Sequence, residues 1–428
     1  MNLLDKILKG AVLSLLLIAC EEPGDLGLEL NPGDSDTEVK FQEFTLPAST
    51  FYIDSMRTDR GANIIVGQNS DPVYGEIISQ TFLELAYDNG QAPLDCLDII
   101  SGSLSFDISD ILSLESVAVL DLEVRALTDT IFPERVYNRT DEIPVGDQVL
   151  DTWSIGVDSG DSVATVELGR GFVNQLWTML ENAEDITDFT MGLNISATTE
   201  SNGLLALNIF GDTTEIILNS RDPLDTAYTT VLTFQNHFNQ IGRDRSGSEI
   251  ASLQQTGDSL SASGEVSYLN GAAGTVVKLR LQPFLDFVNT NDNIIINKAD
   301  IEIPVSLERN NAIEQPIQDI NLYFFKEGTV INGPGIATNV VNTAILPENE
   351  YQALTALPVP RAVLYSSEDQ NYTSTITLFS QSLLTDKLAG DEFLTEDLVV
   401  IPSNFVGIGQ SSILNSGIKL KVFYTTVN

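Results

Sequence analysis

The chain offers few side chains for nucleophilic or metal chemistry. Its 428 residues include one histidine, His237, and two cysteines, Cys20 and Cys96. A zinc site made of Cys and His, or Ser-His-Asp or Cys-His catalysis, would have to use His237. His237 follows an expected strand among polar residues, so we interpret it as a surface or packing residue. We interpret Cys96 as a small buried hydrophobic side chain, because no base is expected near it.

Common catalytic motifs do not occur in the sequence. There is no Gly-x-Ser-x-Gly, Walker-type, Gly-x-Gly-x-x-Gly or His-Glu-x-x-His pattern. Glycoside hydrolysis needs only two carboxylates, and the 61 Asp and Glu residues neither support nor exclude it. We therefore predict a protein that is not an enzyme, with no catalytic or metal-binding residues. Loops such as Asn291–Asn293 could still take a structural Ca²⁺.

Cys20 ends the strongest motif in the chain. Lys6 and Lys9 precede an apolar run from Ala11 to Ala19, which is too short to cross a bilayer as a helix. The run ends in Leu-Ile-Ala-Cys, which resembles the lipobox of bacterial lipoproteins. That resemblance implies a cleaved signal peptide at 1–19 and a diacylglycerol and N-acyl lipid on Cys20. The alternative is an ordinary secretory signal with a chance cysteine.

Two acidic residues, Glu21 and Glu22, follow Cys20 directly. They resemble the surface-export signal of Bacteroidota lipoproteins, although a solvated linker would have the same composition. This resemblance implies a lipid-anchored protein of the outer membrane that faces the cell exterior.

The charge balance excludes several classes of partner. With 21 Lys and Arg against 61 Asp and Glu, the formal net charge is -40. A surface this acidic repels nucleic acids, and it opposes direct docking on anionic lipid headgroups. Hydrophobic residues make up 43% of the chain, so a folded core is expected in place of a disordered acidic tail.

Most of the periodic segments are typical of strands. Alternating or apolar runs predict strands near 117–127, 163–168, 204–210, 213–218, 229–234, 276–281, 301–305, 320–325, 374–379 and 418–424. Phe172, Leu176, Trp177 and Leu180 share one helical face, which we expect to pack on a sheet. The strands do not alternate with helices, so we predict a mainly β protein with two antiparallel β-sandwich, jelly-roll-like domains and a few short helices.

The predicted domain boundaries follow the composition. Residues 20–45 are read as the lipidated cysteine and an acidic tether, and residues 46–240 as the first β-sandwich domain. A polar linker is expected at 241–263, and a second β-sandwich domain at 264–428.

One set of residues after the tether resembles a known family. Arg57-Thr58-Asp59, then Gly67, then Asp71-Pro72-Val73-Tyr74-Gly75 are similar to the opening of a Bacteroidota outer-membrane lipoprotein family that carries a domain of unknown function. Similarity continues in 297–305 and in 420–425. We interpret Arg57, Asp59, Gly67, Asp71, Pro72 and Gly75 as structural, because Asp can cap a turn, Pro fixes φ and Gly takes positive φ.

Two functional hypotheses remain. The family resemblance implies a non-catalytic accessory subunit that binds an outer-membrane β-barrel protein or other lipoproteins, beside β-barrel assembly or export machinery. The alternative is a surface glycan-binding or glycan-active lipoprotein, which would need exposed aromatic platforms. Only Trp153 and Trp177 are tryptophans, so the supply of such platforms is small.

Overall fold

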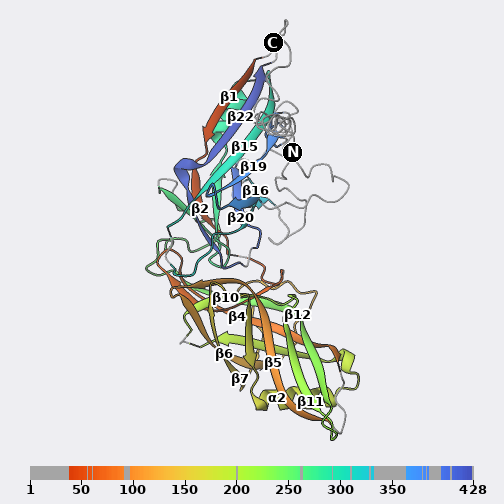
Figure 1. Cartoon of the computed structure of the whole chain (residues 1–428). Helices are drawn as coiled ribbons and strands as arrows, with labels where there is room; N and C mark the ends of the chain where they lie inside the picture. The colour runs from red at the N-terminus through yellow and green to blue at the C-terminus, as the bar shows by residue number, and fades with distance from the viewer. Residues whose placement is uncertain are drawn as a thin grey trace, which may run out of the picture.

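The protein consists of two β units stacked end to end (Figure 1). The computed structural model describes residues 38–54, 56–59, 61–90, 97–198, 201–260, 264–291, 293–308, 311–326, 329–331, 363–377, 379–381, 383–384, 397–404 and 407–426. All strand pairs given for these residues are antiparallel, so the prediction of a mainly β, antiparallel fold is confirmed. None of the helices in these ranges has the length and apolar character needed to cross a bilayer.

The lower unit of Figure 1 holds a ten-stranded sheet. Its strand order is β12-β11-β5-β10-β3-β4-β9-β6-β7, β8 pairs with β5, and a further β12–β4 pairing brings the sheet back on itself. The elements are β3 (Asn63–Asp71), β4 (Gly75–Gly90), β5 (Asp98–Ser113), β6 (Val117–Leu127), β7 (Val145–Asp158), β8 (Val163–Glu167), α2 (Arg170–Glu181), η1 (Ile186–Asp188), β9 (Thr190–Ala197), β10 (Gly203–Asn208), β11 (Glu215–Arg221) and β12 (Ala227–Asp244).

Helix α2 covers the core of the lower unit, as its periodicity predicts. Phe172, Leu176, Trp177 and Leu180 are all buried within the main hydrophobic cluster of this unit. Burial of side chains this large stabilises a fold by about 1.5–3 kcal/mol each. The aromatic face of the helix is therefore part of the core.

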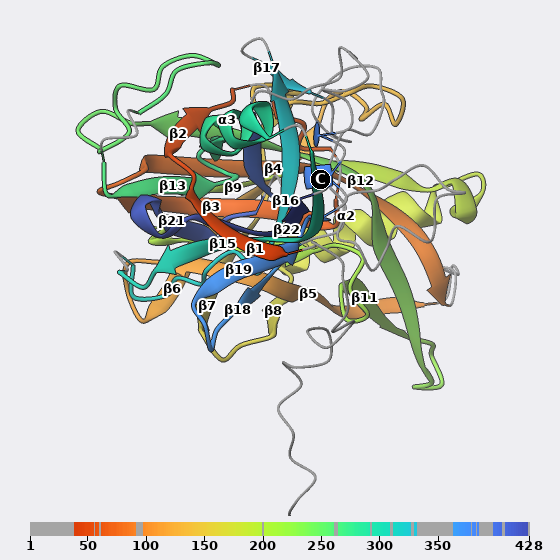
Figure 2. The same cartoon turned by 90° about the horizontal axis from the view of Figure 1, so that it is seen from above.

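The upper unit holds a twelve-stranded sheet built mainly from the C-terminal half. Its order is β1-β22-β15-β19-β18-β16-β20-β14-β13-β21, with β17 on β16, β2 on β14 and an additional β15–β21 pairing. The elements are β1 (Val39–Thr45), β2 (Ala48–Tyr52), β13 (Val266–Asn270), β14 (Thr275–Arg280), α3 (Gln282–Thr290), β15 (Ile294–Ser306), β16 (Asp319–Lys326), β17 (Thr329–Ile331), β18 (Val363–Ser366), β19 (Asn371–Thr375), β20 (Asp397–Pro402), β21 (Gln410–Leu414), η3 (Asn415–Gly417) and β22 (Lys419–Thr426). Viewed from above, β1, β22, β15 and β19 lie beside one another (Figure 2).

The first two strands differ from the predicted domain boundaries. Residues 39–45, assigned to the tether, form β1 and pair with β22. Residues 48–52, assigned to the first domain, form β2 and pair with β14 of the upper unit. Both segments bury apolar side chains, such as Phe44 and Phe51, in the upper core. This burial explains why they pack in the upper unit and not with the residues that follow them in the sequence. The chain thus starts in the upper unit, builds the lower one and returns.

The expected linker at 241–263 also has a different structure in its described part. Strand β12 continues to Asp244, and the following residues are joined by backbone hydrogen bonds to both units. Ile250 N donates to Val73 O of the lower unit (3.2 Å), and Tyr52 N of the upper unit donates to Asp258 O (2.9 Å). This segment, residues 245–260, is a strap across the two units.

Candidate functional site: the junction between the two units

The residues expected at the membrane anchor lie outside the described part of the chain. Cys20, Glu21 and Glu22 all precede residue 38, and Cys96 falls in the gap at 91–96. Their roles stay predictions. The residues of the family motif are described, and most of them lie at or near the junction between the upper and lower units.

The Asp-Pro-x-x-Gly part of the motif forms the turn between β3 and β4. Asp71 Oδ1 accepts hydrogen bonds from Val73 N at 2.7 Å and Tyr74 N at 3.0 Å, which is the turn cap expected of this residue. Pro72 occupies the next position, where its fixed φ suits a turn. Gly75 has a φ of 80°, and a Cβ there would lie 2.3 Å from Asp244 O. The backbone geometry therefore requires glycine at this position.

The same aspartate also reaches the upper unit. Asn311 Nδ2 donates to Asp71 Oδ2 at 2.8 Å, and Asn69 Nδ2 donates to Asn311 Oδ1 at 3.1 Å. Asp71, Asn69 and Asn311 are all buried. A buried carboxylate shared by two backbone N–H groups and an amide is costly to disrupt, because each donor would lose its partner away from water. Asp71 thus caps a turn and joins the two units at once.

Apolar packing supports this polar contact. Val73 and Tyr74, at the tip of the turn, belong to a hydrophobic cluster that includes Leu253 of the strap and Ala272 and Ile408 of the upper unit. Interfaces between domains allow relative motion unless they are large and apolar. This junction combines a buried apolar cluster with buried hydrogen bonds, so we expect the two units to move as one body.

A second polar network crosses the junction around Asp54, which follows β2. Arg139 of the lower unit makes an ion pair with Asp54, and Tyr52 donates its hydroxyl hydrogen to the same carboxylate. Arg243 of β12 donates to Tyr52 Oη at 3.1 Å and to Ala272 O at 2.6 Å. Burial, together with repulsion from Arg139, lowers the pKa of Arg243 to about 9. Arginine suits this place because its planar fork donates to several acceptors at once.

The remaining motif residues stabilise the lower unit beside the junction. Arg57 donates to both carboxylate oxygens of Asp59, at 2.9 and 2.6 Å. Gly67 has a φ of 116°, and a Cβ there would lie 2.1 Å from Gly203 O of β10. Gly67 therefore allows close approach of two strands, and each described motif residue has a structural contact.

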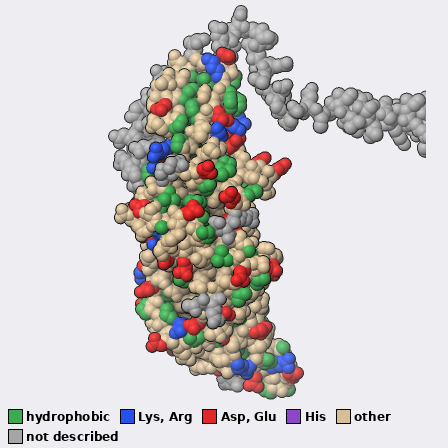
Figure 3. All heavy atoms as spheres, turned by 90° about the vertical axis from the view of Figure 1, so that its left-hand side faces the viewer, with side chains coloured by type: hydrophobic (Ala, Val, Ile, Leu, Met, Phe, Trp, Pro, Cys, Tyr) green, Lys and Arg blue, Asp and Glu red, His purple; other side chains and the backbone are tan. Residues whose placement is uncertain are grey.

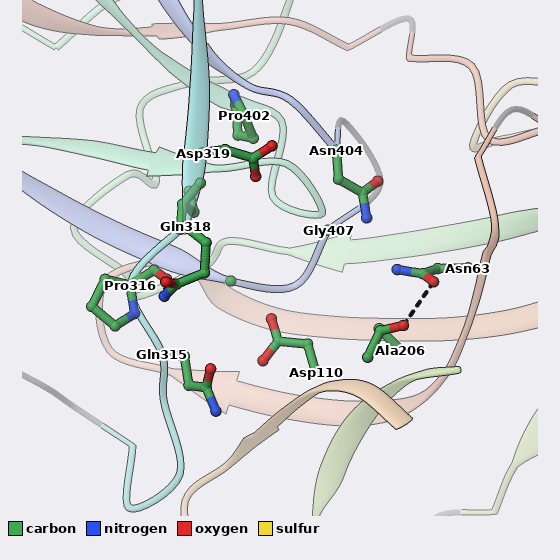
Figure 4. Close-up of a pocket in the computed structure, with 13 residues that line it drawn as sticks. Asn63, Asp110, Ala206, Gln315, Pro316, Gln318, Asp319, Pro402, Asn404 and Gly407 are labelled. Carbon is green, nitrogen blue, oxygen red and sulfur yellow. Dashed lines mark hydrogen bonds between the residues drawn. The ribbon is translucent and has the colours of Figure 1, made fainter. Parts of the chain in front are cut away.

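A small cavity of about 150 Å³, lined by polar and apolar groups, lies at the junction (Figure 4). Asp110 of β5 points into it from below, and Asp319 and Asn404 face it from the upper unit. Burial raises the pKa of Asp110 to about 6, while a hydrogen bond from Ile111 N opposes that rise. The cavity has room for a few water molecules or a small polar group.

His237 lies in the lower unit and is buried. Its ring meets Phe210 edge-on, with 6.3 Å between ring centroids. Burial lowers the pKa of His237 to about 4, despite a hydrogen bond with the Asn63 backbone that favours protonation. Of the two interpretations given above, packing residue and surface residue, the structure supports the first.

The described residues contain no cluster of side chains suited to metal binding. No group of three or more His, Cys, Asp or Glu side chains in them is placed to hold an ion. Asn291 donates its amide to Phe287 O at 2.8 Å, and Asp292 lies outside the described residues. The possible Ca²⁺ loop at Asn291–Asn293 thus stays a prediction.

Sequence reasoning missed most partners at the junction. Asn311 stands 240 positions from Asp71, Arg139 stands 85 from Asp54, and Arg243 stands 191 from Tyr52, so no local pattern points to them. The only sequence signal was the motif itself. Comparison with protein-family models gives no match, and none of the curated proteins matches the chain.

Proposed function

We propose that the protein is a lipid-anchored lipoprotein of the outer membrane, facing the cell exterior. It acts there as a non-catalytic interaction subunit of an outer-membrane protein complex. Its partners are a β-barrel protein, other lipoproteins, or both, and the family resemblance suggests a link to β-barrel assembly or export. The observation that carries this proposal is the junction, where Asp71, Asn311, Asp54 and Arg139 join two β units into one body.

The proposed anchor lies close in sequence to the upper unit, which suggests how the two joined units act. Only 18 residues separate Cys20 from Val39, the first residue of β1, and β1 belongs to the upper unit. A chain of that length spans at most about 65 Å when fully extended. The lower unit therefore stands at the end of an elongated body away from β1 (Figure 1). A stiff joint holds the lower unit at a fixed distance from the point of attachment, as a subunit that positions a partner requires.

The first experiment changes the anchor. The Cys20→Ser variant should lack lipid and be lost from the outer-membrane fraction, while a Cys96→Ser variant should be displayed as the wild type is. Fractionation and surface labelling of intact cells measure this. Normal display of Cys20→Ser would refute the anchor.

The second experiment looks for the complex. The tagged protein is solubilised from its own outer membrane in mild detergent, and stoichiometric partners are identified by mass spectrometry. Recovery of a β-barrel protein or other lipoproteins in fixed ratio supports the proposal. Recovery of the protein alone would refute it and favour the glycan hypothesis, which a glycan array then tests.

The two tryptophans do not supply the exposed platforms that the glycan alternative needs. Trp153 and Trp177 are only 2% and 4% exposed, because both belong to the core of the lower unit. Neither tryptophan can therefore stack on a sugar at the surface.

A further inference from the structure

An apolar patch lies at the end of the upper unit farthest from the junction. Val39 and Phe41 of β1, Phe423 of β22 and Ile295 of β15 are 53%, 52%, 36% and 50% exposed. The register places Val39, Thr425 and Ile295 in one row and Phe41, Phe423 and Lys298 in the next. The rings of Phe41 and Phe423 lie 4.9 Å apart. We call these four apolar residues the tip patch.

The charges around the tip patch differ from those of the rest of the molecule. Strand β1 with Glu38, residues 294–302 of β15 and strand β22 carry four lysines and four acidic residues. Four ion pairs join them, Lys421–Glu302 (2.6 Å), Lys298–Asp300 (2.8 Å), Lys419–Glu43 (3.0 Å) and Lys40–Glu38 (4.0 Å). This surface is neutral, whereas the whole chain carries -40. In Figure 3, hydrophobic, basic and acidic side chains lie intermixed over this end of the molecule.

We propose that the tip patch rests on the lipid bilayer, with Phe41 and Phe423 inserted among the headgroups. This inference rests on the proposed lipid anchor at Cys20. The chain outside the described structure joins β1 at Val39, within the patch, so an anchored molecule brings this end to the membrane first. Tethering makes the contact intramolecular, and a weak affinity for lipid is then enough to keep it formed.

The charge distribution fixes the orientation. The acidic body is repelled by anionic headgroups, while the neutral tip is not. Exposed phenylalanines bury apolar area in the interface, and they lie on the outer face of the sheet, opposite Tyr424, which packs on Phe287 of the upper core. The molecule therefore stands upright, with the lower unit pointing away from the membrane.

The test uses the mature chain, residues 20–428, with Cys96→Ser so that Cys20 is its only thiol. Cys20 is coupled to a maleimide lipid in vesicles of phosphatidylethanolamine and phosphatidylglycerol, with or without brominated acyl chains. Phe41→Trp reports on the tip patch. Leu224→Trp is the control, because Leu224 is 87% exposed in the β11–β12 turn of the lower unit. The parent chain gives the background from the two buried tryptophans.

We expect brominated lipid to quench the added fluorescence of Phe41→Trp at least about twofold and to leave that of Leu224→Trp unchanged. If Phe41→Trp does not fold, Phe423→Trp replaces it. Equal quenching at positions 41 and 224, or none at 41, would overturn the proposal.

Two further experiments test whether a second copy of the chain or a protein partner occupies the tip patch. A dimer of the uncoupled chain in sedimentation that Phe41→Ser abolishes would assign the patch to a second copy. A protein crosslinked from position 41 in cells in fixed ratio would assign it to a protein partner. Either result overturns lipid contact. In the vesicle test, chemical coupling replaces acylation, so a negative result there does not contradict the proposed lipid anchor at Cys20. Conversely, normal display of Cys20→Ser in cells would refute the anchor and would not change the result with vesicles.

Discussion

Replacing Asp71 by alanine tests whether the motif turn joins the two units. The change removes three hydrogen bonds, from Val73 N, Tyr74 N and Asn311 Nδ2, all at a buried site. A buried donor left without its partner costs about 1–3 kcal/mol, and Asn311 Nδ2 keeps a contact with Glu314 at 3.2 Å. We therefore expect Asp71→Ala to lower the free energy of unfolding by about 3–5 kcal/mol.

Chemical denaturation of the unlipidated chain measures this loss, followed by the fluorescence of Trp153 and Trp177 in the lower core. Hydrogen exchange locates it. Ile250 N, which bonds to Val73 O, should exchange faster in the variant, while the amides between β6 and β7 should not change. Asp222→Ala is the matched control, because Asp222 also accepts two backbone N–H bonds in a turn but is only partly buried.

The reasoning is refuted if Asp71→Ala is no more damaging than Asp222→Ala. A double-mutant cycle with Asn311→Ala isolates the bond between the units, for which we expect a coupling of about 1–2 kcal/mol. Additivity of the two substitutions would show that Asp71 caps its turn without joining the units.

Three further predictions concern single positions. Gly75→Ala should lower the free energy of unfolding by more than about 2 kcal/mol in denaturant titrations, because the added Cβ would meet Asp244 O. Gly247 also has a φ of 80° but has open space around it, so Gly247→Ala should cost only about 1 kcal/mol. The pKa of His237 in the folded state should be about 4 in an NMR titration of this single imidazole. Because the unfolded state takes its proton near pH 6.5, the free energy of unfolding should fall by up to about 3 kcal/mol from pH 6.5 to 4. A folded-state pKa above 6 would contradict the burial of this side chain. Because the pKa of Asp110 is raised to about 6, the folded state binds this proton more tightly than the unfolded state does. The free energy of unfolding should therefore fall by about 2 kcal/mol as the pH rises from 4 to 6. Identical pH profiles for wild type and Asp110→Asn would contradict this.

Local patterns in the sequence predicted the elements that local forces determine. The alternation at 117–127 became β6, and the apolar face around Trp177 became the buried side of α2. Helix α3 has a weaker signal, since it spans only nine residues, although Pro283 in its first turn is typical of a helix start. Strand β1 was hidden for a different reason: its short alternation follows a Gly-, Asp- and Pro-rich stretch, and its pairing partner β22 is nearly 400 residues away.

The junction marks the limit of such reasoning. The motif correctly predicted a capped turn with glycine at positive φ, because turn chemistry depends on neighbouring residues. What the turn binds depends on Asn311 and on the strap, which only the folded chain brings to it. The cavity beside Asp110 is likewise formed by both units together.

Two small groups of cationic side chains, one at the junction and one at the tip, differ in residue type. Arg139, Arg243 and Arg245 gather at the junction around Tyr52, where a fixed fork of donors can satisfy several buried acceptors. The strands of the tip carry lysines, whose long apolar stems can lie along an interface while the ammonium groups remain in water. Arginine thus suits a rigid junction, and lysine suits a tip that approaches a surface which repels the rest of the molecule.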